Sequence, residues 1–189
     1  MYNNYLNKAY NLHIINTDKF KTISIKINFK KKLVKEDITY RNLLGKILLS
    51  STAKYPTKKD MEIQTEDLYG VSVNYTSSLM GNYIVSSFNS SFLNEKYTEE
   101  GMNEKTIAFL LEIIFNPNIE NGKFKYFDLG KRLVLDEIDS LKDNVKKYSL
   151  QRLLEILGEK TPLQYNSIGY KDDLDKITNE QLLKYYQKM

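Results

Sequence analysis

The sequence predicts an α+β protein with an antiparallel-rich sheet and with helices packed on one face of that sheet. Apolar and polar residues alternate with a period of two, as in half-buried strands, over 20–29 and 71–76, and Ile84, Phe88 and Phe92 share one face of a further strand over 83–92. Apolar residues recur at helical spacing over 37–52, 104–115 and 123–143. The order of two strands, two helices, a hairpin and then several helices favours an antiparallel sheet covered on one side.

The composition limits the class of protein. The chain has 189 residues, of which 41% are hydrophobic and 28% charged, so it has enough apolar residues to bury a core. It contains no Cys, which excludes disulfides and thiolate metal sites. We see neither a signal peptide nor an apolar run of membrane-spanning length, and we expect a cytoplasmic protein without a membrane partner. The net charge of +4 is too balanced to indicate nucleic acid as a partner.

The first strands are expected at 12–16 and 20–29. The second is the clearer one, because Ile23, Ile25 and Ile27 alternate with polar residues and define one buried face. The three lysines at 30–32 are typical of a strand end that lies in solvent.

A central helix is predicted over 37–52, with Asp37 or Thr39 as its N-cap. Its apolar side is broad. Asn42, Gly45 and Lys46 stand three and four residues apart and therefore share one face of the helix.

A second helix is expected over 58–68, capped by Thr57 and with Met61, Ile63 and Leu68 turned inward. The strands over 71–76 and 83–92 then form a hairpin. We expect a loop of several residues between them, containing Ser77, Ser78 and Gly81.

The remainder is mostly helical. We predict an exposed loop over 94–103, helices over 104–115, 123–143 and 144–157, and an irregular segment over 159–175. Thr178 and Gln181 form a capping box for a last helix over 179–188. Residues 1–189 are interpreted as a single domain, and we expect it to be part of a longer two-domain protein.

Several motifs in this order resemble the N-terminal domain of the insulinase-like (M16, pitrilysin-type) metallopeptidases. The resemblance covers nearly the whole chain and is carried by NLLGK at 42–46, DLYG at 67–70, VNYTS at 73–77, FNP at 115–117, LVLDEI at 133–138 and YNSIG at 165–169. In particular, the chain resembles inactive-type bacterial homologues associated with the 5-aminopentanol modification of elongation factor P. The resemblance also implies a link to processing proteases.

Active members of this family carry H-x-x-E-H on the central helix and a further Glu on a later helix. The resemblance places Asn42 at the first His, Gly45 at the general base and Lys46 at the second His. Glu137 stands at the position of the remaining ligand and is retained.

These replacements are incompatible with zinc chemistry. A hydrolytic zinc needs three protein ligands and an open position for water, whereas Asn is a poor ligand and Gly has no side chain. The only histidine, His13, lies on a predicted strand far from the helix. We therefore expect no catalytic residue, no metal ligand and no cofactor in this chain, although active relatives use zinc.

Glu137 adjoins an apolar stripe, where a carboxylate needs a partner. One hypothesis is that Lys46 replaces the metal charge and pairs with Glu137. The alternative is that Glu137 is an ordinary surface residue of its helix.

The resemblance also implies a peptide-binding strand, made of Val73, Asn74, Tyr75, Thr76 and Ser77, to whose edge a substrate adds as a further strand. The alternative is an edge strand protected from aggregation by its polar residues.

Three functions remain open from the sequence. The favoured one is an inactive insulinase-like subunit that binds a peptide or protein and pairs with an active homologue, or with a second copy of itself. The alternatives are an active zinc metallopeptidase of the same family and a scaffolding subunit without peptide binding.

Overall fold

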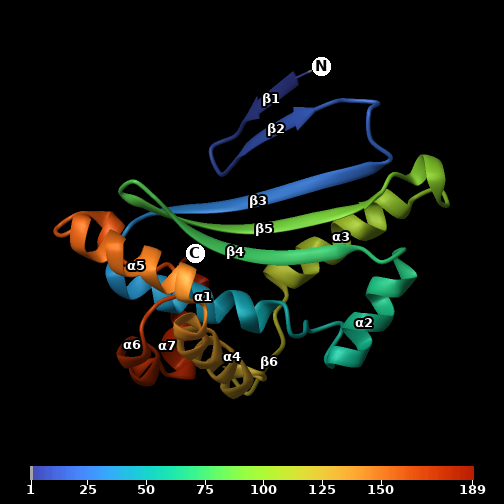
Figure 1. Ribbon diagram of the computed structural model, residues 1–189. Coiled ribbons are helices and arrows are strands. Elements are labelled where there is room, and N and C mark those ends of the chain that lie inside the picture. Colours follow the sequence, from blue (N-terminus) through green and yellow to red (C-terminus); the bar gives the residue numbers. More distant parts are fainter. Residues whose placement is uncertain (1) are drawn as a thin grey trace.

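The computed structural model describes residues 2–189 and consists of an antiparallel sheet with helices on one side (Figure 1). The sheet has the strand order β3-β5-β4, and its strands are β3 (Thr22–Lys32), β4 (Ser72–Met80) and β5 (Tyr83–Leu93). A separate hairpin of β1 (Tyr2–Leu6) and β2 (Asn11–Ile15) lies on the other side of β3 from β5. The predicted α+β class is confirmed.

The helices are α1 (Lys35–Leu48), α2 (Lys58–Asp67), α3 (Met102–Phe115), α4 (Phe127–Ser140), α5 (Val145–Leu157), α6 (Lys171–Lys176) and α7 (Asn179–Gln187). Short 3-10 turns cover Glu95–Tyr97, Leu141–Asp143 and Pro162–Gln164, and β6 (Ile119–Glu120) pairs with β7 (Lys123–Phe124).

Helix α1 is at the centre of the core. Leu43, Leu44, Ile47 and Leu48 are buried against Phe88 of the sheet and against apolar residues of α3, α4, α6 and α7. Burying such a side chain stabilises the fold by roughly 1.5–3 kcal/mol. The central helix therefore has little freedom to move relative to the sheet.

The start of α1 differs from the prediction. Val34 is the N-cap and provides no side-chain cap, while Asp37 and Thr39 are buried inside the helix. Their side chains are used in tertiary contacts: Asp37 Oδ2 lies 2.8 Å from Lys31 Nζ, and Thr39 Oγ1 accepts a hydrogen bond of 3.1 Å from the Tyr170 N–H. These two side chains therefore bind residues outside the helix instead of capping its start.

The predicted hairpin is present, but its loop has only two residues. Met80 pairs with Tyr83, and Gly81 has a φ of +57°, which is the conformation required at the first central position of a type II′ turn. Ser77 and Ser78 belong to β4 rather than to the turn.

Helix α2 has the predicted cap at Thr57, which forms a capping box with Asp60. Met61 and Leu68 are buried as expected, whereas Ile63 is 46% exposed, so its assignment to the inner face was wrong.

The predicted helix over 123–143 begins later than expected. Asn121 and Gly122 have positive φ and form a tight turn between β6 and β7, so that Phe124 is a buried strand residue and α4 starts at Phe127. The capping box of Thr178 and Gln181 at α7 is confirmed. The sequence analysis missed β1, and it also missed α6 within the segment expected to be irregular.

Candidate functional site

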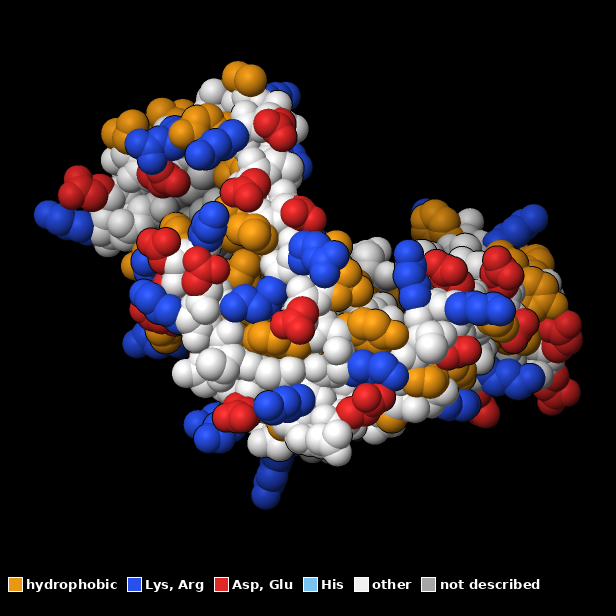
Figure 2. Space-filling view, turned by 90° about the horizontal axis from the view of Figure 1, so that it is seen from below, with side chains coloured by type: hydrophobic (Ala, Val, Ile, Leu, Met, Phe, Trp, Pro, Cys, Tyr) orange, Lys and Arg blue, Asp and Glu red, His pale blue; other side chains and the backbone are white. Residues whose placement is uncertain are grey.

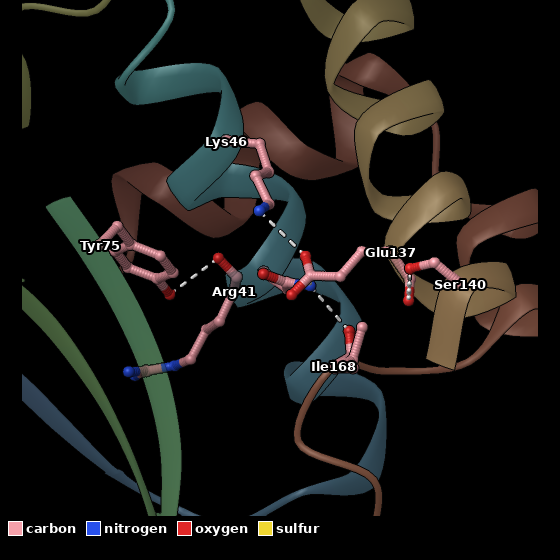
Figure 3. A network of polar contacts seen from close by, with 7 residues as sticks. Arg41, Lys46, Tyr75, Glu137, Ser140 and Ile168 are labelled. Atoms are coloured by element: carbon pink, nitrogen blue, oxygen red, sulfur yellow. Dashed lines mark hydrogen bonds and ion pairs between the residues drawn. The ribbon is translucent and has the colours of Figure 1, made fainter. Parts of the chain in front are cut away.

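The structure brings α1 and α4 together at the predicted degenerate site (Figure 3). Lys46 Nζ lies 2.9 Å from Glu137 Oε2, so the ion pair proposed from the sequence is present. The two side chains are 34% and 38% exposed, so Glu137 is also a surface residue. A pair in such a position contributes at most about 1 kcal/mol to stability. Its main effect is therefore to neutralise the carboxylate.

Asn42 is buried next to this pair and acts as a donor. Its Nδ2 donates a hydrogen bond of 2.9 Å to the Ile168 carbonyl and lies 3.5 Å from Glu137 Oε2. The segment before α6 thus packs on Asn42. The hydrogen bond connects α1 to a part of the chain more than a hundred residues later. A side chain engaged in this way has a structural role.

Gly45 has no side chain, and the ring of Tyr75 from β4 lies against it. The Tyr75 hydroxyl donates to the Arg41 carbonyl at 2.8 Å and lies 2.9 Å from Ser86 Oγ. Burial raises the pKa of the Tyr75 hydroxyl above its usual range, so it stays protonated as a donor. The tyrosine therefore connects the central helix to the sheet.

Arg41 is a site residue that the sequence analysis missed. Its side chain is only 2% exposed, and Nη1 donates to the Phe29 carbonyl at 2.7 Å and to Ser86 Oγ at 2.8 Å. Nε donates to the Tyr185 hydroxyl at 3.1 Å. The available signal was a cationic residue within the apolar stripe of α1, three residues after Ile38.

Tyr185 gives this network a dependence on pH. Burial raises the pKa of Tyr185 to about 12, above its ordinary value of 10.0. A group whose pKa is raised on folding stabilises the native state below its unfolded pKa, and this stability is lost as the pH rises through the folded pKa. We expect the free energy of unfolding to fall between about pH 10 and pH 12, and Tyr185→Phe to remove part of that fall in denaturant titrations. Tyr148→Phe on α5 is the control, and an unchanged alkaline profile in Tyr185→Phe would contradict the prediction.

The predicted peptide-binding strand is an edge of the sheet, because β4 pairs only with β5 within residues 2–189. The Leu33 N–H donates to the Asn82 carbonyl, and the Asn94 N–H donates to the Lys21 carbonyl. Because hydrogen-bonded pairs alternate along an antiparallel ladder, the backbone N–H and C=O groups of the even-numbered β5 residues point toward β3. The backbone groups of the odd-numbered β5 residues therefore point the other way and bond to those of the even-numbered β4 residues.

The backbone N–H and C=O groups of Val73, Tyr75, Ser77 and Leu79 consequently point to the open edge. Their side chains are partly buried toward the helices, whereas those of the even-numbered residues are exposed. Asn74, for example, accepts a bond of 3.1 Å from Asn89 Nδ2 on the exposed face. The backbone groups of Asn74 and Thr76 face β5 rather than the open edge.

A shallow cavity of about 360 Å³ adjoins the beginning of this edge. It is lined by Val73 and Asn74 of β4, by Met61 and Thr65 of α2, and by Phe109 of α3 among others. This volume is at the lower end of the roughly 300–1,000 Å³ typical of ligand sites, which matches a side chain rather than a whole cofactor.

The residues at the degenerate site do not fit a zinc ion. Within residues 2–189 no three His, Cys, Asp or Glu side chains are grouped as a metal site. Lys46 places a cation next to the one retained carboxylate, where a metal ion would be repelled. His13 lies on β2 of the separate hairpin, beyond the β3 edge of the sheet, where its Nδ1 is 2.7 Å from the Tyr2 hydroxyl.

The surface on the helix side carries both signs of charge. Figure 2 shows basic, acidic and hydrophobic side chains interspersed over this face, without a large region of one sign. No helix within residues 2–189 is long and apolar enough to cross a membrane.

The chain is similar to proteins of the M16 type. It is 33% identical over 179 residues to the "Probable inactive metalloprotease YmfF" of Bacillus subtilis, which covers 93% of this chain and 42% of that protein. No protein-family model matches the chain.

Among solved structures, a conserved protein from Enterococcus faecalis has a TM-score of 0.87 and 28% identity, over 94% of this chain and 43% of that one. A peptidase M16 inactive domain from Pseudomonas fluorescens has a TM-score of 0.72 at 14% identity, over 98% of this chain and 43% of that one, and it shares the fold. A protease from Helicobacter pylori has a TM-score of 0.69 at 14% identity, over 98% of this chain and 42% of that one.

The chain thus spans less than half the length of the relatives it matches. The relative from Bacillus subtilis is described as inactive, and the motif positions 42, 45 and 46 of this chain hold Asn, Gly and Lys. The chain is a homologue of the probable inactive metalloprotease YmfF, and it has the fold of the peptidase M16 inactive domain.

Proposed function

We propose that this protein binds extended peptide segments without hydrolysing them, and that the open edge of β4 is the binding element. The observation that supports the proposal most is the orientation of the backbone groups of Val73, Tyr75, Ser77 and Leu79, which point to an edge that no other strand covers within residues 2–189. A peptide that adds to such an edge gains main-chain hydrogen bonds and places alternate side chains toward the helices. One of these side chains would enter the cavity next to Val73.

Ser77 offers a matched pair of variants for the test. Ser77→Pro removes an N–H that points to the open edge, and proline is tolerated in edge strands at such positions. Ser77→Ala keeps the N–H and removes only the side-chain hydroxyl, which is buried next to Tyr75. The probe is fluorescein-labelled carboxymethylated lactalbumin, which is permanently unfolded, and its binding is measured by fluorescence anisotropy.

We expect the wild-type chain and Ser77→Ala to bind the probe. Ser77→Pro should bind roughly 2- to 10-fold more weakly, since one hydrogen bond is worth about 0.5–1.5 kcal/mol and each tenfold in affinity is about 1.4 kcal/mol. Equal binding by Ser77→Pro would exclude the β4 edge. No binding by the wild-type chain would favour the scaffolding alternative.

The active-peptidase alternative is tested by metal content. After incubation with zinc and desalting, we expect elemental analysis of the purified chain to find no stoichiometric zinc, because the site offers one carboxylate and a lysine. One zinc per chain together with peptide hydrolysis would establish the alternative.

We also propose that the protein works as a subunit, paired with an active insulinase-like homologue. The hairpin β1–β2 exposes Leu6 and Ile15, and helix α5 exposes Leu153, Ile156 and Leu157. A two-stranded hairpin is marginally stable by itself, and exposed apolar patches mark protein interfaces.

The test mixes the chain with a purified active homologue and measures mass by light scattering after size exclusion. A one-to-one complex that is lost in the double variant L153K/I156K supports this pairing. A dimer of the chain alone would point instead to pairing with a second copy, and persistence of the complex in the variant would place the interface elsewhere.

A further inference from the structure

The side of α1 on which a general base would stand is filled by an aromatic ring. A Cβ atom added to Gly45 would lie 2.2 Å from Tyr75 Cδ1, 2.3 Å from Cε1 and 2.6 Å from Cγ. Real Cβ atoms do not approach other atoms so closely, and protein interiors leave no spare volume to relieve such an overlap.

The ring is fixed in this place from several directions. Its hydroxyl bonds to the Arg41 carbonyl and contacts Ser86 Oγ, and the ring packs on Phe88 with the ring centroids 5.0 Å apart and an interplanar angle of 60°. Moving the ring away from Gly45 would break the hydrogen bond and leave a buried hydroxyl unpaired, which is costly. The overlap is therefore not relieved by a simple side-chain rotation.

We propose that Tyr75 occupies the space that the missing side chain at position 45 would need, and that Gly45 and Tyr75 together form a lock that holds the open edge of β4 against α1. The lock requires both partners, because only glycine leaves room for the ring and only an aromatic ring fills the gap. Tyr75 is thus a positioning residue for the edge strand.

The replacements at positions 42 and 46 have different partners from the replacement at position 45. Asn42 and Lys46 reach Glu137 on α4, whereas the face of α1 at Gly45 meets Tyr75 on β4 (Figure 3). Substitutions at 42 and 46 therefore leave the lock intact, while any side chain at 45 collides with it. The inference does not depend on peptide binding, because its readouts are stability and backbone exchange.

The experiment measures the melting temperatures of Gly45→Ala, Tyr75→Ala and the double variant G45A/Y75A. In the native background we expect Gly45→Ala to lower the melting temperature by about 4–10 °C, from the usual cost of overpacking. In the Tyr75→Ala background the same change is expected to raise it by roughly 1–4 °C, because alanine is favoured over glycine inside a helix.

Two further backgrounds serve as controls. Tyr75→Phe retains the ring, so Gly45→Ala should still lower the melting temperature there. Val73→Ala shortens a neighbouring side chain on the same face of β4 and should leave the penalty unchanged. If Gly45→Ala fails to fold, folding of the double variant supports the lock, and failure of both variants overturns it.

A second readout distinguishes positioning from a general loss of stability. Amide hydrogen exchange in Tyr75→Ala should accelerate across β4 more than across the β3 side of the sheet. A uniform acceleration over the sheet, or a Gly45→Ala effect of the same sign and size in both backgrounds, would overturn the proposal.

Discussion

Replacing Arg41 by methionine is expected to lower the free energy of unfolding by about 3–5 kcal/mol, because hydrogen bonds from a buried charged group to three acceptors are lost and the packing of the methionine offsets only part of that loss. The guanidinium is buried and donates to the Phe29 carbonyl, to Ser86 Oγ and to the Tyr185 hydroxyl. Methionine fills the space of the aliphatic part of the arginine side chain but has no hydrogen-bond donor. The Phe29 carbonyl, Ser86 Oγ and the Tyr185 hydroxyl would each lose a charged donor, and a hydrogen bond to a charged group is worth roughly 1.5–3 kcal/mol.

Urea denaturation near pH 7 measures this effect, and Arg132→Met is the matched control. Arg132 is exposed on α4, and its replacement should change the stability by no more than about 0.5 kcal/mol. Arg41→Lys keeps the charge but lacks the planar guanidinium, so its loss of stability should lie between those of Arg41→Met and Arg132→Met. A loss below about 1 kcal/mol in Arg41→Met would show that water replaces the guanidinium.

Gly169→Ala is expected to destabilise the protein by about 2–4 kcal/mol, from the cost of a left-handed residue and from overpacking. Gly169 has a φ of +104°, and an added Cβ would lie 2.6 Å from Thr39 Oγ1 and 2.9 Å from Thr39 Cα. The Cα belongs to the central helix and does not move aside. The same change displaces Ile168, whose carbonyl accepts the hydrogen bond from Asn42.

Gly101→Ala separates the two contributions. Gly101 has a φ of +82°, and no atom lies within 4 Å of the position of an added Cβ, so only the conformational cost of about 1–2 kcal/mol applies. Thermal and urea unfolding of both variants should therefore show a distinctly larger loss for Gly169→Ala. Equal losses would mean that the loop shifts away from α1 at little cost.

The two central variants test different parts of one arrangement. Arg41 connects α1 to the sheet and to α7, whereas Gly169 connects α1 to the segment that closes over Asn42. Helix α1 is thus held by polar contacts on both sides.

Local sequence patterns determined several elements. The alternation of Ile23, Ile25 and Ile27 identified β3, and the capping boxes at Thr57 and Thr178 identified the starts of α2 and α7. These signals succeed because a strand period and a capping box involve only neighbours in the chain. Helical spacing also placed Asn42, Gly45 and Lys46 close together on α1, whereas their assignment to a degenerate metal site came from the family resemblance.

Only the tertiary structure decided which partners these residues have. It turned Asp37 and Thr39 from expected caps into buried contacts with Lys31 and with the Tyr170 N–H. It also placed Tyr75 on Gly45, a pairing that no local pattern encodes because the two residues lie on different elements. Residue types and spacing thus determined that the zinc ligands are missing, whereas the packing of β4 and α4 on α1 decided what fills their place.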